Sequence, residues 1–165
     1  MIIESIQSEG GCQFGRMHSK LFDRNIDVAI ENADAEYAEK CAEYFNSMPS
    51  ELINELKKYT LRYCEDFRQF FDKDSPEVPD SVGESEIFGY ISPRILIIKT
   101  PKSSDKIAFS VEFGCDWEPE HGMEWTINDG KALYVGDFVG MDPWYNETFF
   151  QKTGMNYVFS KHCID

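Results

Sequence analysis

The residues whose types could support chemistry gather in one short stretch, residues 115–124. It holds four carboxylates and one imidazole: Asp116, Glu118, Glu120, His121 and Glu124. Carboxylates combined with one histidine can bind magnesium, manganese or zinc. Their spacing matches no known ligand template, however, and His18 and His162 are remote in the sequence. A small metal-dependent enzyme built on this loop is therefore the alternative hypothesis. The favoured interpretation, without a metal, is that Asp116 and His121 hydrogen-bond the loop backbone and fix its shape.

A thiol nucleophile is the second chemistry that these residue types suggest, with Cys115 as the nucleophile and His121 as its base. Such catalysis needs a lowered thiol pKa. The surrounding carboxylates would raise that pKa instead, and no helix is predicted to begin at Cys115. Cys163 beside His162 lies in a C-terminal tail and is a weaker candidate. The sequence therefore predicts neither a catalytic residue nor a cofactor.

Aromatic residues near these carboxylates suggest a third role, which is protein binding. Trp and Tyr are frequent energetic anchors of protein interfaces. We expect one partner-binding surface made by Asp116, Trp117, Glu118, Glu120, His121, Trp144 and Tyr145. The alternative is that Trp117 only caps the edge of the core.

The charge of the chain restricts the kind of partner. The 165 residues include 30 acidic and 16 basic side chains, which gives a formal net charge of −14. Such a surface repels the phosphates of nucleic acids and anionic membranes. A basic protein is the partner it favours, although an acidic surface that serves only solubility is the simpler alternative. We therefore expect a non-catalytic interaction protein that binds a basic partner.

The cysteines and the start of the chain indicate the compartment. The five cysteines are widely spread and form no Cys-x-x-Cys pair, which argues against a disulfide framework and a structural zinc site. Reduced thiols are typical of the cytoplasm. The first residues lack the apolar run of a signal peptide, and no stretch approaches the ~20 apolar residues of a membrane span. These features predict a soluble cytoplasmic protein.

Alternating apolar and polar residues on both sides of the 115–122 loop predict a β-sheet. Residues 107–113, 123–127 and 133–135 each show a period of two, which is typical of antiparallel strands with one buried face. Asn128-Asp129-Gly130 predicts a hairpin turn between the last two strands, because these residues tolerate left-handed backbone. Pro119 must interrupt pairing within the loop.

The rest of the chain predicts helices and further strands. We expect strands at 14–20, 26–30, 94–100 and 155–160, helices at 35–45 and 49–71, a short helical turn at 87–90 and a solvated connector at 72–86. Asp34 is the expected N-cap of the first helix. The order of elements predicts a single α+β domain over residues 1–165. Its antiparallel sheet would begin with an N-terminal hairpin and carry both helices on one face.

The segment Cys-Asp-Trp-Glu-Pro-Glu-His-Gly at residues 115–122, followed by Met-Glu-Trp and a hairpin, resembles an uncharacterised bacterial domain family. Members carry a Cys-Asp/Asn-Trp-acidic-x-Glu-His-Gly segment that enters a hairpin, and Phe14-Gly15 is similar to their first strand. Proteins of this type sometimes resemble immunity proteins of bacterial toxin systems, which implies a non-catalytic inhibitor. The resemblance implies no catalytic residues.

Overall fold

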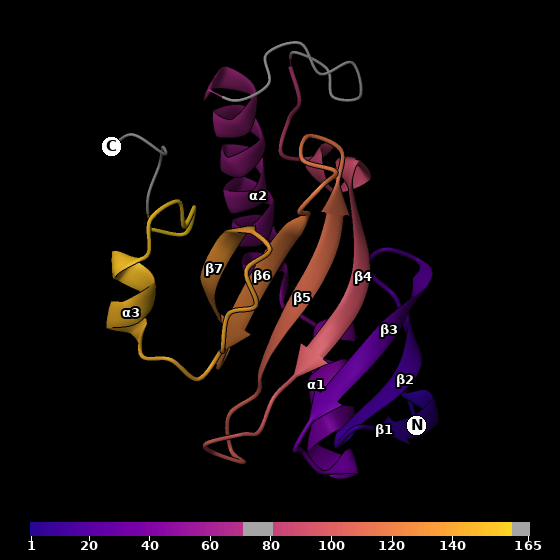
Figure 1. The fold of residues 1–165 in the computed structure, drawn as a ribbon. Coiled ribbons are helices and arrows are strands. Elements are labelled where there is room, and N and C mark those ends of the chain that lie inside the picture. Colours follow the sequence, from indigo (N-terminus) through magenta and orange to yellow (C-terminus); the bar gives the residue numbers. More distant parts are fainter. Residues whose placement is uncertain (71–80, 160–165) are drawn as a thin grey trace.

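The computed structural model of the protein describes residues 1–70 and 81–159 and is built on one seven-stranded sheet (Figure 1). In chain order the elements are β1 (Glu4–Glu9), β2 (Cys12–Ser19), β3 (Arg24–Glu31), α1 (Ala35–Asn46), α2 (Ser50–Phe70), a 3-10 helix η1 (Ile87–Tyr90), β4 (Ile91–Ile98), β5 (Ala108–Cys115), β6 (Met123–Asn128), β7 (Lys131–Asp137) and α3 (Glu147–Lys152). The predicted α+β class, with an N-terminal hairpin and helices packed against the sheet, is confirmed.

The strands lie side by side in the order in which they occur in the sequence, from β1 to β7. Every neighbouring pair is antiparallel except β3 and β4, which are parallel. Two parallel strands need a long connection. Here α1 and α2 lie within that connection: α1 packs against β2 and β4, and α2 packs behind β6 and β7. The strand predicted to be central is β4, with three strands on each side.

Helices α1 and α2 cover one face of the sheet and bury their apolar sides there (Figure 1). The side chain of Asp34 accepts a hydrogen bond from the Tyr37 amide at 2.7 Å, so the predicted N-cap is confirmed. Helix α1 buries Tyr37, Ala38, Cys41, Ala42 and Phe45, and α2 buries Leu52, Leu56, Tyr63 and Cys64. The indole Nε1 of Trp125 on β6 donates to the Thr60 hydroxyl of α2 at 3.1 Å, which ties the helix to the strand next to the β7 edge.

The turn between β6 and β7 has the predicted chemistry. Asn128 pairs with Lys131, so the connection has two residues, Asp129 and Gly130. Both have positive φ, 52° and 76°, as the preferred hairpin turns require. The hairpin prediction is confirmed.

The opposite face of the sheet is covered only in part. After β7 the chain crosses this face as an irregular segment, residues 138–143, which we call the strap (Figure 1). At one end the Phe138 amide donates to the Gly122 carbonyl at 3.3 Å. At the other end the Asn128 side chain donates to the Pro143 carbonyl at 2.9 Å. Because Gly122 precedes β6 and Asn128 ends it, the strap runs the length of β6.

The local structure differs from the predictions at strand β1, at helix α3 and at residues 155–159. Strand β1 was not predicted, because all six of its residues are exposed and its sequence therefore has no alternation. The described part of the predicted 155–160 strand forms turns, and the unpredicted helix α3 precedes it. Of the predicted connector and second helix, residues 71–80 lie outside the described residues, as does residue 160 of the predicted last strand.

Candidate functional site: the acidic loop between β5 and β6

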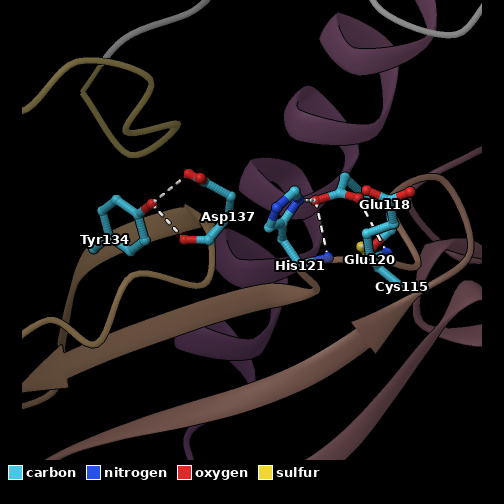
Figure 2. Close-up of polar contacts among 6 residues, drawn as sticks. All are labelled: Cys115, Glu118, Glu120, His121, Tyr134 and Asp137. Carbon is cyan, nitrogen blue, oxygen red and sulfur yellow. Dashed lines mark hydrogen bonds and ion pairs between the residues drawn. The ribbon is translucent and has the colours of Figure 1, made fainter.

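The acidic loop, residues 115–122, joins β5 to β6 at one end of the sheet (Figure 2). The Asp116 amide donates to the Tyr90 carbonyl at 3.0 Å, which fixes the start of the loop against η1. Gly122 ends the loop with φ at 76°, and a Cβ there would collide with the Phe113 carbonyl oxygen. Only glycine therefore fits where the chain turns back into the sheet.

Trp117 belongs to the core, which corrects its predicted place on a binding surface. Only 1% of its surface is exposed. Its ring meets the Tyr63 ring of α2 edge to face, with centroids 5.6 Å apart and planes at 87°. Among the described residues its Nε1 has no hydrogen-bond partner. The indole anchors the loop to α2 because burying so large an apolar side chain at the open end of the sheet is strongly favourable.

Glu118 fixes the shape of the loop. The residue is 8% exposed, and its carboxylate accepts hydrogen bonds from the amides of Glu120 and His121, both at 3.2 Å. It also contacts Nδ1 of His121 at 2.6 Å, so three groups of the same turn converge on one carboxylate (Figure 2). Asp116, Glu120 and His121 are exposed. The loop is thus hydrogen-bonded internally, with Glu118 as an acceptor that the expectation did not include.

Three of the proposed metal ligands come together, and two do not. Ligand atoms of Glu118, Glu120 and His121 all lie within 4.8 Å of one another. Asp116 does not belong to that group, and Glu124 points to the strap instead. Both oxygens of Glu118 already accept hydrogen bonds from the loop. The hydrogen bonds that close the loop are therefore enough to explain why these three side chains lie together.

Cys115 lacks the features of a nucleophile. Its thiol is buried and donates to the Glu118 carbonyl at 3.5 Å. Burial is the main reason that the pKa of Cys115 is raised to about 12; the Glu118 carboxylate acts in the same direction, and the hydrogen bond to the Glu118 backbone opposes the shift. At neutral pH the reactive thiolate is scarce.

Glu124, one of the candidate ligands in the metal-site alternative, binds the strap and does not belong to the cluster of Glu118, Glu120 and His121. It is fully buried and holds the strap, because its Oε1 accepts from the amides of Val139 at 3.2 Å and Gly140 at 2.8 Å. Its Oε2 accepts from the Met141 amide at 2.8 Å and the Thr126 hydroxyl at 3.0 Å. Burial raises the pKa of Glu124, although these hydrogen bonds act in the opposite direction. No local signal marks this role, since the strap lies fifteen or more residues further along the chain.

Comparison with known proteins adds one result. The model of a family described as a domain of unknown function, DUF6985, matches residues 2–142. The chain belongs to DUF6985. No curated protein and no solved structure matches the chain. Within the described residues, every helix is too short or too polar to cross a lipid bilayer.

Trp144 and Tyr145 lie just beyond the DUF6985 match and far from the acidic loop. They follow Pro143 at the Asn128 end of β6, whereas the loop meets the Met123 end. A strand of this length separates its ends by ~17 Å. Trp144 is half-buried, and Tyr145 is 46% exposed with its ring 4.6 Å from the ring of Phe149. The single surface expected from the sequence is therefore divided between two ends of the sheet.

Proposed function

We propose that this DUF6985 domain is a non-catalytic protein-binding module that engages a basic partner through the acidic end of its sheet. One observation carries the proposal: the loop buries Trp117 and Glu118 and leaves Asp116, Glu120 and His121 outside. The buried pair fixes the loop, so its exposed charges are held in place before a partner arrives. Binding surfaces that are ordered in advance lose less conformational entropy on association.

The charge around the loop supports a cationic partner. Exposed Glu84 and Glu86 immediately precede η1, which contacts the loop through the Tyr90–Asp116 hydrogen bond. Asp137, which accepts the Tyr134 hydroxyl at 3.0 Å, lies on the other side of His121 (Figure 2). Carboxylates from three segments of the chain, residues 84–86, 116–120 and 137, thus lie at this end of the sheet. Acidic groups so arranged would raise the rate of encounter with a cationic surface.

The proposed surface is smaller than the one inferred from the sequence. Trp117 acts by fixing the loop, and Trp144 and Tyr145 are too distant to share a small interface with it. We assign partner contact to Asp116, Glu120 and His121. The finer hypotheses are that this contact occurs in the cytoplasm and that the partner is a basic toxin inhibited by this protein. The four described cysteines, all free thiols, are compatible with a reducing compartment.

The test is capture of the partner from the native cell, followed by surface plasmon resonance at two salt concentrations. Glu120→Lys should lower the association rate constant about tenfold at low salt, and added salt should reduce this difference. Glu43→Lys makes the same charge change on an exposed residue of α1 and is the matched control. Equal effects of both variants, or rates independent of salt, would refute the proposed surface. Stoichiometric metal that His121→Ala removes would favour the enzyme alternative.

A further inference from the structure

The two edge strands of the sheet, β1 and β7, differ in whether another segment of the described chain hydrogen-bonds to their outer side. At the β7 edge, the Tyr157 amide donates to the Val135 carbonyl at 2.9 Å, and the Val135 amide donates to Asn156 Oδ1 at 3.3 Å. Asn156 Nδ2 also donates to the Leu133 carbonyl at 2.8 Å. The buried Asn156 amide thus takes the place of a peptide group from an eighth strand. This edge is closed by the protein itself.

The β1 edge is open in the described structure and lies at the outer side of the sheet (Figure 1). A two-residue turn, Gly10-Gly11, joins β1 to β2, and both glycines have positive φ. Glu9 pairs with Cys12 and Gln7 with Phe14, so the peptide groups of these β1 residues face β2. Successive residues of a strand direct their N–H and C=O groups to opposite sides. The peptide groups of Ser8 and Ile6 therefore point away from β2 and out of the sheet edge. Among the described residues, none bonds to these outward groups.

A bulge limits how much of this edge can pair. Between Gln7 and Glu4 the chain of β1 advances three residues while β2 advances two, from Phe14 to Arg16. The extra residue falls at Ser5, whose φ is 57°. Bulges are a common way to shorten an exposed edge. Residues 6–9 therefore form the segment that can accept another strand.

Side chains beside this segment define what an added strand should carry. Gln7 and Phe14 line a groove of about 430 Å³ that reaches Ile95, with the Arg16–Asp27 ion pair at its rim. Phe14 is 44% exposed there. Nearer the turn, the pairing places Glu9, Cys12 and Glu31 in one row across the sheet. The same face thus offers an apolar position and, two residues along, an acidic one.

We infer that β1 accepts an extended, cationic segment of a partner protein as an additional strand. Main-chain hydrogen bonds to Ile6 and Ser8 would hold the segment. Every second side chain of the segment would contact the face of the sheet that carries Gln7 and Glu9. An aliphatic side chain would lie beside Gln7, facing the groove that Phe14 also lines, and a lysine or arginine would lie beside Glu9. A second copy of this chain fits poorly, because each copy carries a net charge of −14 and β1 contains two glutamates and no basic residue.

This inference does not depend on the acidic loop. The loop follows β5, four strand positions from β1, which corresponds to ~19 Å. The two surfaces can therefore be tested separately with single variants. Glu120→Lys changes only the loop, and Ser8→Pro changes only the edge. Proline is tolerated on an edge strand at a position whose amide faces solvent.

The experiment uses the full chain and a capped heptapeptide, Lys-Thr-Val-Thr-Lys-Thr-Val, in which lysine and valine alternate on one face. Amide hydrogen exchange should show new protection of Ile6 and Ser8 when the peptide is added. Ser8→Pro removes one outward donor and should weaken binding about tenfold, while Glu120→Lys should leave it unchanged. Unaltered exchange in β4 to β6 would show that Ser8→Pro folds normally.

Two control peptides separate strand pairing from simple charge attraction. One has the same sequence with the backbone nitrogens N-methylated at alternate residues, and the other has glutamate in place of lysine. Both should lose binding. The inference is overturned if the methylated peptide binds as well as the parent, or if protection appears elsewhere. It is also overturned if no protection appears at about 1 mM parent peptide.

Discussion

The acidic loop and the strap are both held by a glutamate that accepts backbone amides, but the two glutamates lie in different surroundings. Glu118 is 8% exposed at the end of the sheet, and two of its three contacts are with neighbouring amides. Glu124 is fully buried on the face of the sheet and binds amides fifteen to seventeen residues away. The first carboxylate organises a local turn, and the second joins distant parts of the chain.

This difference indicates separate roles for the two regions. The strap is a cover, because it removes Glu124, Thr126 and Ser110 from water. The acidic loop has buried supports but an exposed outer surface, with Asp116, Glu120 and His121 in solvent. Four predictions test the comparison.

The largest effect should follow Glu124→Ala. The substitution leaves three strap amides without their acceptor inside the protein, so the free energy of unfolding should fall by about 3–5 kcal/mol. Urea denaturation measures this loss. Glu112→Ala is the control, since Glu112 pairs directly with Glu124 across the sheet but is half-buried. Equal losses in both variants would contradict the role given to Glu124.

Gly122→Ala should have the next largest effect, because Gly122 joins the acidic loop to the strap. Its φ is 76°, and an added Cβ would collide with the Phe113 carbonyl oxygen. We expect the free energy of unfolding, measured by urea denaturation, to fall by about 2–4 kcal/mol. Gly140→Ala is a matched control with the same φ of 76° and open space around its Cα. It should cost about 1 kcal/mol. A smaller loss at Gly122 than at Gly140 would show that the loop can move away.

Glu118→Gln should have a smaller effect, because the turn that it closes is local. The glutamine side chain keeps one oxygen acceptor but lacks the negative charge that faces two backbone amides and the His121 ring. We therefore expect the free energy of unfolding to fall by about 1–2 kcal/mol. Thermal or urea unfolding checks the value. Glu120→Gln removes an exposed neighbouring charge and should change stability by less than about 0.5 kcal/mol. If the two variants behave alike, Glu118 does not fix the loop.

The smallest effect concerns pH. Because burial raises the pKa of Glu124, the folded protein binds this proton more tightly than the unfolded chain does. Its contribution to stability is therefore complete below the ordinary carboxyl pKa and is lost as pH rises through the raised value. The stability advantage of the wild type over Glu124→Gln should shrink as pH increases above about 4.5. Urea denaturation at several pH values measures it, and a widening difference would have the wrong sign.

The sequence predicted the regular elements well where one face of an element is apolar and packs into the core. The period of α2 and the alternation in β5 and β6 reflect such apolar faces. The alternation did not reveal that the polar face of β6 is buried as well. Asp129-Gly130 was recognisable because its backbone conformation depends on local residue types. Strand β1 was missed for the opposite reason, since neither of its faces is buried and nothing imposes a pattern.

The candidate site was predicted less completely than the fold. The stretch 115–124 was identified as chemically unusual, and its glutamates do organise loops. The sequence could not show which side chains face inward, because Trp117 is buried by α2, which lies about fifty residues earlier. Nor could it show that Tyr145 lies at the other end of β6, because that depends on the path of the strap.

By itself the sequence determined the features that depend on local periodicity and residue chemistry: helices α1 and α2, the β6–β7 hairpin and the acidic character of the 115–122 loop. Only the tertiary structure decided which carboxylates are buried, which edge of the described sheet remains open and which aromatic residues are exposed. The physical reason is that burial and pairing depend on contacts between segments far apart in the chain. A glutamate that accepts amides inside the protein, such as Glu124, and one that faces solvent, such as Glu120, have the same local sequence signal.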